Sequence, residues 1–234
     1  CEIWGFHKGA DIETLHLYYL KRILKVRKKT VNHMVYFELG RLPLYVNRYV
    51  RMVRYWLKLL ESNNCILNSI YEDMYESSFV KPNDKLNWSC KIRDILNRYG
   101  FNDIWLAQSV GNSQLFLHEF KKRIVDNYIA EALSFFENTS KCNLYQYIHD
   151  GHTLQFYLNR PLNSLYQSYV TKYRINSHSL NVETGRYFNI SRNERVCNMC
   201  NKKVIEDEYH FILECDKYAN VRSKYIKIYY CRNP

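Results

Sequence analysis

The sequence predicts a mainly α-helical protein, organised as multi-helix bundle units with a small module of three cysteines and one histidine (CCHC) near its C-terminal end. Glycine and proline, which interrupt helices, number only 7 and 4 among 234 residues. Several segments repeat apolar residues every three or four positions, as amphipathic helices do. The cysteines and the histidine of the module fall between positions 197 and 215.

Turn-forming residues set the limits of the expected helices. These helices span residues 11–26, 31–39, 43–62, 65–77, 84–99, 112–137, 142–149 and 162–180, with breaks near Gly40, Pro82, Gly100, Gly111 and Pro161. We group them into a basic three-helix unit at 1–62, a helical connector at 63–160, and a helix followed by the CCHC module at 161–234. Between the last helix and the module we expect a mostly irregular stretch.

The helix expected at 43–62 has the clearest amphipathic pattern. Its apolar stripe, roughly 120° wide at 3.6 residues per turn, contains Val46, Tyr49, Val50, Val53, Trp56, Leu57 and Leu60. Its opposite side carries Arg48, Arg51, Arg54 and Lys58. We expect the stripe to pack against other helices and the cations to face outward.

Two further sets of residues are interpreted as structural. The helix at 112–137 places Leu117, Phe120, Ile124, Tyr128 and Phe135 on one side, which indicates core packing. His149 and His152 flank a glycine in an expected turn and have no third ligand nearby, so we interpret them as surface histidines.

The CCHC module has the ligand spacing of a structural zinc site. Cys197, Cys200, His210 and Cys215 follow the pattern C-x2-C-x9-H-x4-C, which can bring three thiolates and one imidazole to one tetrahedral ion. We predict one structural Zn²⁺; the alternative is four unrelated residues in a chain with 8 Cys and 8 His. On an ideal α-helix His210 and Cys215 would point roughly 140° apart. We therefore expect the short helix that carries His210, with acidic residues 206–208 in its first turn, to end or loosen before Cys215.

Positive charge is concentrated in the first quarter of the chain. Residues 1–60 hold 12 Lys/Arg and 4 Asp/Glu, a net +8 of the total +11. This balance indicates an acidic partner such as RNA or DNA, held by backbone contacts. The candidate residues form one cluster before residue 30, the cationic side of helix 43–62, and a group beside the CCHC module: Lys21, Arg22, Lys25, Arg27, Lys28, Lys29, Arg48, Arg51, Arg54, Lys58, Arg186, Arg192 and Arg195.

Other interpretations of these residues stay open. A row of cations is often just a solvated helix face, and contact with a membrane surface is a further alternative. The 22 Tyr and 11 Phe could supply base-stacking platforms, but no aromatic residue stands out among the cations. The CCHC segment itself is net acidic, so zinc there could serve structure only.

The sequence also bears on location. No apolar run approaches the ~18 residues of a membrane-spanning helix, and no signal-peptide pattern is present. The cysteines outside the module, Cys1, Cys65, Cys90, Cys142 and Cys231, show no disulfide framework. We expect an intracellular protein of the nucleus or cytoplasm. Because the sequence begins with Cys1 rather than Met, we also expect a fragment of a longer protein.

Several segments resemble the C-terminal part of non-long-terminal-repeat retrotransposon polyproteins, downstream of the reverse-transcriptase palm. Residues 1–5 (CEIWG) are similar to the motif that opens the thumb of that family, and residues 33–40 and 41–49 are similar to its thumb helices. Residues 180–187, followed by the CCHC set, resemble its terminal zinc-binding region. The resemblance implies a thumb-like unit that grips template–primer duplex, a zinc region that binds element RNA or target DNA, and an upstream palm domain as partner.

The chain departs from a complete enzyme of that family. It has no Tyr-x-Asp-Asp polymerase motif, and residues 71–74 (YEDM) lack the second Asp. Paired metal-binding carboxylates for phosphoryl transfer and an endonuclease motif are also missing from the sequence. We therefore predict a non-catalytic fragment that binds nucleic acid and zinc. The alternative is a zinc-stabilised helical module for protein interaction or structure.

Overall fold

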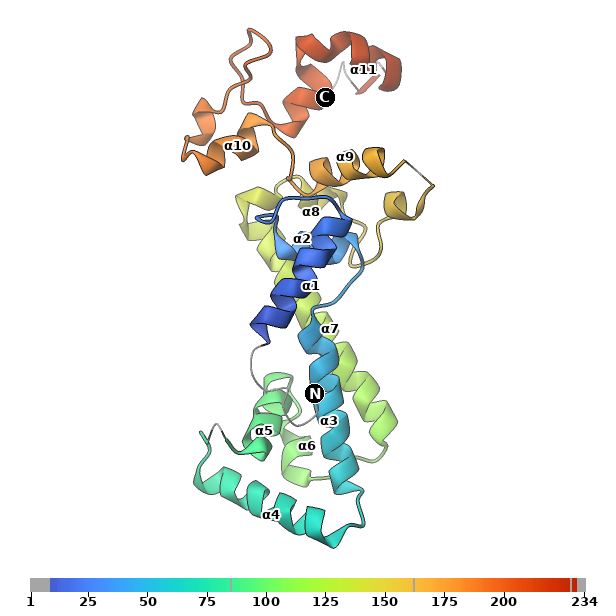
Figure 1. Cartoon of the computed structure of the whole chain (residues 1–234), viewed down its shortest axis with the longest axis vertical. Coiled ribbons are helices and arrows are strands. Elements are labelled where there is room, and N and C mark those ends of the chain that lie inside the picture. The colour runs from blue at the N-terminus through green and yellow to red at the C-terminus, as the bar shows by residue number, and fades with distance from the viewer. Residues whose placement is uncertain (1–8, 85, 162, 228, 231–234) are drawn as a thin grey trace.

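The computed structural model describes residues 9–84, 86–161, 163–227 and 229–230, and places its helices in three tiers along one long axis (Figure 1). Among these residues the structure contains helices and two isolated β-bridges but no strand. The longer helices are α1 (Ala10–Ile23), α2 (Asn32–Glu38), α3 (Leu44–Leu60), α4 (Cys65–Val80), α5 (Trp88–Arg98), α6 (Asn102–Ala107), α7 (Ser113–Asn138), α9 (Ser164–Arg174), α10 (Asn181–Tyr187) and α11 (Ala219–Tyr225). The predicted mainly α-helical fold is confirmed.

The lower tier consists of α4, α5 and α6 packed on α3 and the first half of α7. The apolar stripe of α3 forms its centre: Val46, Val50, Val53, Trp56 and Leu57 are all buried. Trp56 donates its indole N–H to the Tyr71 hydroxyl of α4 at 2.7 Å. The predicted orientation of α3 is therefore confirmed, with Met52 as an additional buried residue.

The middle tier is formed by α1, α2, α9, the second half of α7 and the short α8 (Tyr145–Ile148). Helix α7 joins both tiers through Phe120, Ile124, Tyr128, Ala132 and Phe136, which are buried at four-residue intervals. The predicted core position of Phe135 is wrong, because its side chain is 38% exposed while the adjacent Phe136 is buried. Strict four-residue spacing drifts around an α-helix of 3.6 residues per turn, which lets α7 face different partners along its length.

A buried ion pair fastens α9 to α2. The Glu38 carboxylate is fully buried and accepts from Arg174 Nε at 3.1 Å, while Arg174 also donates to Gln155 Oε1 at 2.7 Å. Tyr157 donates its hydroxyl to the same carboxylate. Burial raises the pKa of Glu38, opposed by its bonds to Tyr157 and Arg174. Such a network holds its members in one arrangement because breaking any one bond leaves a buried polar group without its partner.

The loop before η2 (Phe156–Asn159) lies directly against the end of α2. Gly40, at φ +57°, permits this approach, since a Cβ atom there would lie 2.6 Å from the backbone nitrogen of Leu154. His149 and His152 belong to this loop and pack edge-on against the Phe37 ring. Their interpretation as surface histidines is therefore wrong: both are half-buried beside the middle-tier core.

Asparagine caps set where several helices begin. Asn64, Asn87, Asn112 and Asn163 accept hydrogen bonds from backbone N–H groups two or three residues ahead, which is the preferred role of asparagine at an N-cap. The cap at Asn87 explains why α5 begins at residue 88 rather than at the predicted residue 84. The segment predicted as one helix at 142–149 instead forms η1 (Ser140–Cys142) and α8.

The predicted helix at 162–180 ends early as α9. Asn176 adopts the left-handed conformation at φ 53°, and Ser177 N donates to Lys172 O at 2.8 Å, which closes the helix. The stretch predicted as irregular then contains α10. Helices α6, α10 and α11 are only six or seven residues long. In these three helices the apolar periodicity is too short to be recognised from sequence.

The lower core and the middle core each combine residues from before and after position 62. Helix α3 shares the lower core with α4–α7, whereas α1 and α2 share the middle core with α7 and α8. The division of the chain at 62 and 160 stays a prediction. The upper tier contains α10, the CCHC residues and α11 (Figure 1).

Candidate metal centre and basic surfaces

The four predicted ligands meet at one point in the upper tier. The candidate ligand atoms of Cys197, Cys200, His210 and Cys215 all lie within 4.8 Å of one another, so the group could hold one metal ion. Cys197 Sγ lies 4.0 Å from Cys215 Sγ, and Cys200 Sγ lies 3.4 Å from His210 Nε2. Tetrahedral bonds of about 2.3 Å to sulfur and about 2.0 Å to nitrogen imply S–S and S–N separations of about 3.8 and 3.5 Å. The geometry therefore fits a shared ion, and the sulfur atoms are too far apart for a disulfide bond.

A short hairpin positions the first two cysteines. Val196 and Ile205 form an antiparallel bridge, and Cys197 N donates to Val204 O at 2.8 Å. At the turn, Met199 N donates to Cys197 Sγ at 3.4 Å. The C-x2-C spacing thus forms a tight turn whose backbone N–H points at a ligand sulfur.

A π-turn positions the other two ligands. Residues His210–Glu214 form a π-helical turn, closed by Cys215 N donating to His210 O at 2.7 Å. Because this turn pairs residue i with residue i+5, His210 and Cys215 lie one turn apart on the same side. The predicted loosening of the helix before Cys215 thus takes the form of a wider turn.

Acidic residues near the hairpin contact His210 and the start of α10. Asp207 accepts from His210 N at 2.9 Å, and Glu214 Oε2 lies 3.4 Å from His210 Nδ1. A carboxylate at the second ring nitrogen orients a ligating histidine in metal sites. Glu206 accepts from Asn181 N at 2.8 Å at the start of α10. These acidic side chains therefore accept hydrogen bonds from, or lie beside, particular groups of the module and of α10.

Burial disfavours charged thiolates in this group unless a cation is bound there. The side chains of His210 and Cys215 are 2% and 0% exposed, and burial raises the pKa of the Cys197 thiol. A thiolate in this position is favoured when a positive ion compensates its charge.

The arginines beside the module mostly hold it together. Arg186 pairs with Glu183, with Nε 2.9 Å from Oε1, and Arg195 donates to Val182 O at 2.9 Å. Arg192 is exposed in η3 (Arg192–Glu194). Two of these three predicted nucleic-acid contacts, Arg186 and Arg195, therefore bind other groups within the protein.

The cations of α3 lie on its outer side. Arg51, Arg54 and Lys58 are exposed, whereas Arg48 is half-buried with its guanidinium beside the Tyr49 ring and near Gly9. Helix α3 begins next to the first turn of α1, where Leu44 N donates to Glu13 Oε2 at 2.9 Å, and runs down into the lower tier (Figure 1).

The basic cluster at residues 21–29 lies at the other end of α1. Lys21 donates to Lys28 O and Asn32 Oδ1, both at 2.7 Å, and burial lowers its pKa. Arg22 donates to the Tyr18 hydroxyl at 2.8 Å. The structure therefore separates this cluster from the cations of α3, instead of joining them in one patch.

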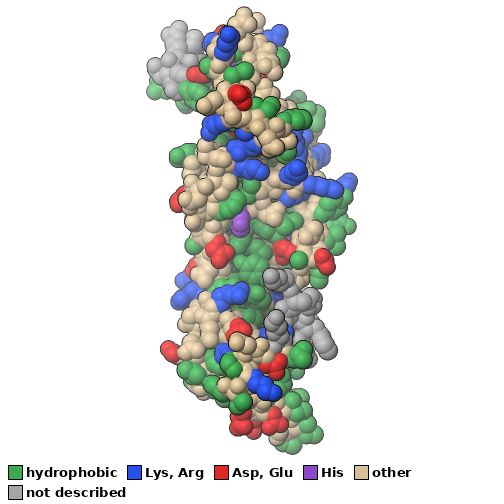
Figure 2. All heavy atoms as spheres, turned by 90° about the vertical axis from the view of Figure 1, so that its left-hand side faces the viewer, with side chains coloured by type: hydrophobic (Ala, Val, Ile, Leu, Met, Phe, Trp, Pro, Cys, Tyr) green, Lys and Arg blue, Asp and Glu red, His purple; other side chains and the backbone are tan. Residues whose placement is uncertain are grey.

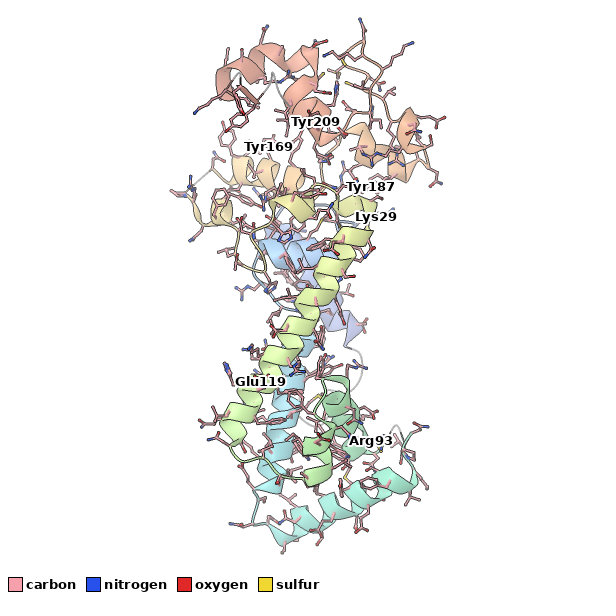
Figure 3. All side chains as sticks on the ribbon, turned by 180° about the vertical axis from the view of Figure 1, so that it is seen from behind. Lys29, Arg93, Glu119, Tyr169, Tyr187 and Tyr209 are labelled. Carbon is pink, nitrogen blue, oxygen red and sulfur yellow. The ribbon has the colours of Figure 1, made fainter. Side chains whose placement is uncertain are left out.

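The loop after α1 reaches the next tier. Lys25 donates to Ser164 Oγ of α9 at 2.6 Å, and the Arg27 and Lys29 cations lie 5.7 and 5.1 Å from the centre of the Tyr187 ring of α10. Figure 3 shows Lys29 beside Tyr187. Lys172 of α9 shares a groove with Lys25 and Arg27. We call Lys25, Arg27, Lys28, Lys29 and Lys172 the basic junction.

Charge is distributed unevenly along the molecule. On the face that Figure 2 shows, Lys and Arg side chains are concentrated where the middle tier meets the upper tier, and a group of Asp and Glu side chains lies at the lower end. Sequence reasoning missed Lys172, because its contribution depends on α9 lying against the loop after α1.

No helix in the described part of the chain is long and apolar enough to cross a membrane. Among the cysteines that the structure describes, including the buried Cys90 and Cys142, none forms a disulfide bond. The residues 1–5 motif, with Cys1, and Cys231 lie outside the described residues. Comparison with models of known protein families, with curated proteins and with solved structures found no match.

Proposed function

We propose that this chain is a non-catalytic, zinc-stabilised module that binds the backbone of RNA or DNA. Zn²⁺ is the ion that best suits three thiolates and one imidazole in a closed tetrahedral group. Its role here is structural, because all four positions are filled by side chains and none is left for a substrate. The resemblance to the post-palm region of retrotransposon reverse transcriptases makes an upstream palm domain the natural partner.

The observation that carries the proposal is the convergence of cations at the basic junction. Its residues come from the loop after α1 and from α9, so the fold adds charge from distant parts of the sequence. Such a surface attracts polyphosphate and releases counterions when it binds. The exposed cations of α3 provide a second, separate contact for a longer duplex. The alternative function, a protein-interaction module, predicts no such dependence on phosphate.

A salt titration of binding to a short RNA–DNA duplex tests the proposal. For about five phosphate contacts, the logarithm of the association constant should fall with that of salt concentration at a slope of about −4 to −5. The variant Lys25→Gln/Lys28→Gln/Lys29→Gln should flatten this slope by about 2 to 3, and Arg51→Gln/Arg54→Gln/Lys58→Gln should also flatten it.

A matched control removes the same charge elsewhere. Lys203, Lys217 and Lys224 are exposed in the upper tier and do not line the groove that holds Lys25 and Lys172. Their replacement by Gln should change the slope by less than one unit. Absence of salt-dependent binding, or equal effects of all three variants, would reject the proposal in favour of the interaction module.

A further inference from the structure

A groove with basic and aromatic walls lies between the middle and upper tiers. It has a volume of about 470 Å³ and is lined by the loop after α1, by α9 and by the segment that follows it. The lining includes the cationic side chains of Lys25, Arg27 and Lys172 and the rings of Tyr169, Tyr173 and His178. Among the residues described, no Asp or Glu lines it. Its walls therefore favour an anionic ligand that also offers flat rings.

Helix α9 presents Tyr169 and Tyr173 to this groove, and Tyr166 continues the row beyond the groove lining. Tyr166, Tyr169 and Tyr173 are three and four positions apart, which at 100° per residue places them within about 60° of one another on the side away from the buried Ser168 and Thr171. The first two are 64% and 50% exposed. Figure 3 shows Tyr169 where the middle tier meets the upper tier. Exposed aromatic side chains in a row normally reduce solubility, so their exposure calls for a ligand.

The inner end of the row is fixed by the upper tier. The Tyr173 ring stacks on Phe211, with centroids 5.4 Å apart and an interplanar angle of 24°, and lies 5.2 Å from the His178 ring. His178 is held by Glu208, with Nε2 2.7 Å from Oε1. The groove wall thus depends on residues adjacent to the candidate metal centre, so the metal would order the groove as well as the hairpin.

Cations accompany the exposed rings. Lys172 Nζ lies 5.8 Å from the centre of the Tyr169 ring, and Lys25 lines the same groove as both residues. Phosphates of a bound strand would therefore find positive charge within reach of each stacked base.

The spacing of the rings favours an unpaired strand. Along the helix axis Tyr166, Tyr169 and Tyr173 are about 4.5 and 6 Å apart, more than the 3.4 Å between stacked bases of a duplex. A paired base also keeps both faces inside its own stack, so only a splayed base can cover a tyrosine.

We propose that α9 and the basic junction form a binding track for single-stranded nucleic acid, with bases stacked on Tyr166 and Tyr169 and phosphates held by Lys25, Arg27 and Lys172. This inference rests on the proposed function and specifies which form of nucleic acid this groove binds. It also explains why the junction cations lie beside exposed rings rather than on a purely polar surface.

The test compares base-bearing and abasic oligonucleotides of equal length, as RNA and as DNA, with the whole chain loaded with zinc. Phosphates are the same in both, so a preference for either base-bearing strand measures stacking. Tyr166→Leu/Tyr169→Leu should remove that preference, lowering affinity for the base-bearing strand by roughly 5- to 150-fold per ring. Affinity for the abasic strand should change by less than about 2-fold. The salt slope should stay that of wild type, because no cation is removed.

Two controls separate stacking from other effects. Tyr166→Phe/Tyr169→Phe keeps the rings and should bind like wild type. Tyr147→Ala removes a tyrosine that is 82% exposed on α8, away from the groove, and should also bind like wild type. Equal affinity of wild type for base-bearing and abasic strands overturns the track while leaving backbone binding intact. Absence of salt-dependent binding to every probe rejects the proposed function itself.

Discussion

Replacing one metal ligand, Cys215→Ser, should unfold the upper tier locally and leave the lower two tiers folded. The buried aliphatic side chains of segment 177–215 are Leu180 and Val182, whose burial contributes about 1.5–3 kcal/mol each. Structural zinc contributes on the order of 10–16 kcal/mol in small zinc-binding peptides. The metal therefore stabilises this segment more than its apolar burial does, and loss of the metal should unfold it.

Metal analysis and hydrogen–deuterium exchange can follow this change. Wild type purified under reducing conditions should contain one zinc per chain, and the variant much less. Backbone amides such as Cys197 N and Cys215 N, which are hydrogen-bonded within the module, should lose protection. Amides of α7 should keep theirs, because the lower and middle cores contain none of the four ligands.

Cys142→Ser is the matched control. Cys142 is also fully buried, but in the middle core, and burial raises its thiol pKa to about 11. A hydroxyl there should lower global stability while zinc content stays at one. Wild type without zinc, or a Cys215→Ser variant with unchanged metal content and exchange, would refute the metal centre.

Three stability predictions concern the lower tiers, each measured by denaturant unfolding. Trp56→Ala should cost roughly 3–5 kcal/mol because the ring is fully buried, whereas Arg51→Ala should change stability by less than about 0.5 kcal/mol; equal effects would contradict the orientation of α3. Arg174→Met should cost about 3–5 kcal/mol by leaving Glu38 buried and uncompensated, and an unchanged midpoint would contradict this. Burial lowers the pKa of His33, opposed by Glu131, so wild type should lose stability as pH falls below about 6.5; His33→Phe should weaken that loss, and identical pH profiles would contradict it.

Helix type and helix faces are the features most accessible from the sequence. Apolar residues at three- and four-residue spacing predicted α3, and Val46, Val50, Val53, Trp56 and Leu57 are buried as expected. The ligand set was also predicted, because a hairpin and one helical turn are local structures that spacing describes well. Even the incompatibility of His210 and Cys215 with an ideal α-helix could be worked out in advance.

Contacts between distant segments depended on the tertiary structure. Two of the three predicted basic groups lie within residues 1–60, yet α1 holds them apart at its opposite ends, because charge alone does not determine where helices pack. Tyr169 and Lys172 share a groove with Lys25 only because α9 lies against the loop after α1, and the buried Arg174–Glu38 pair holds α9 there. The sequence by itself therefore determined the helices and the metal ligands, which depend on neighbours along the chain. The groove was set by packing, since it joins residues as distant in the sequence as Lys25 and Lys172.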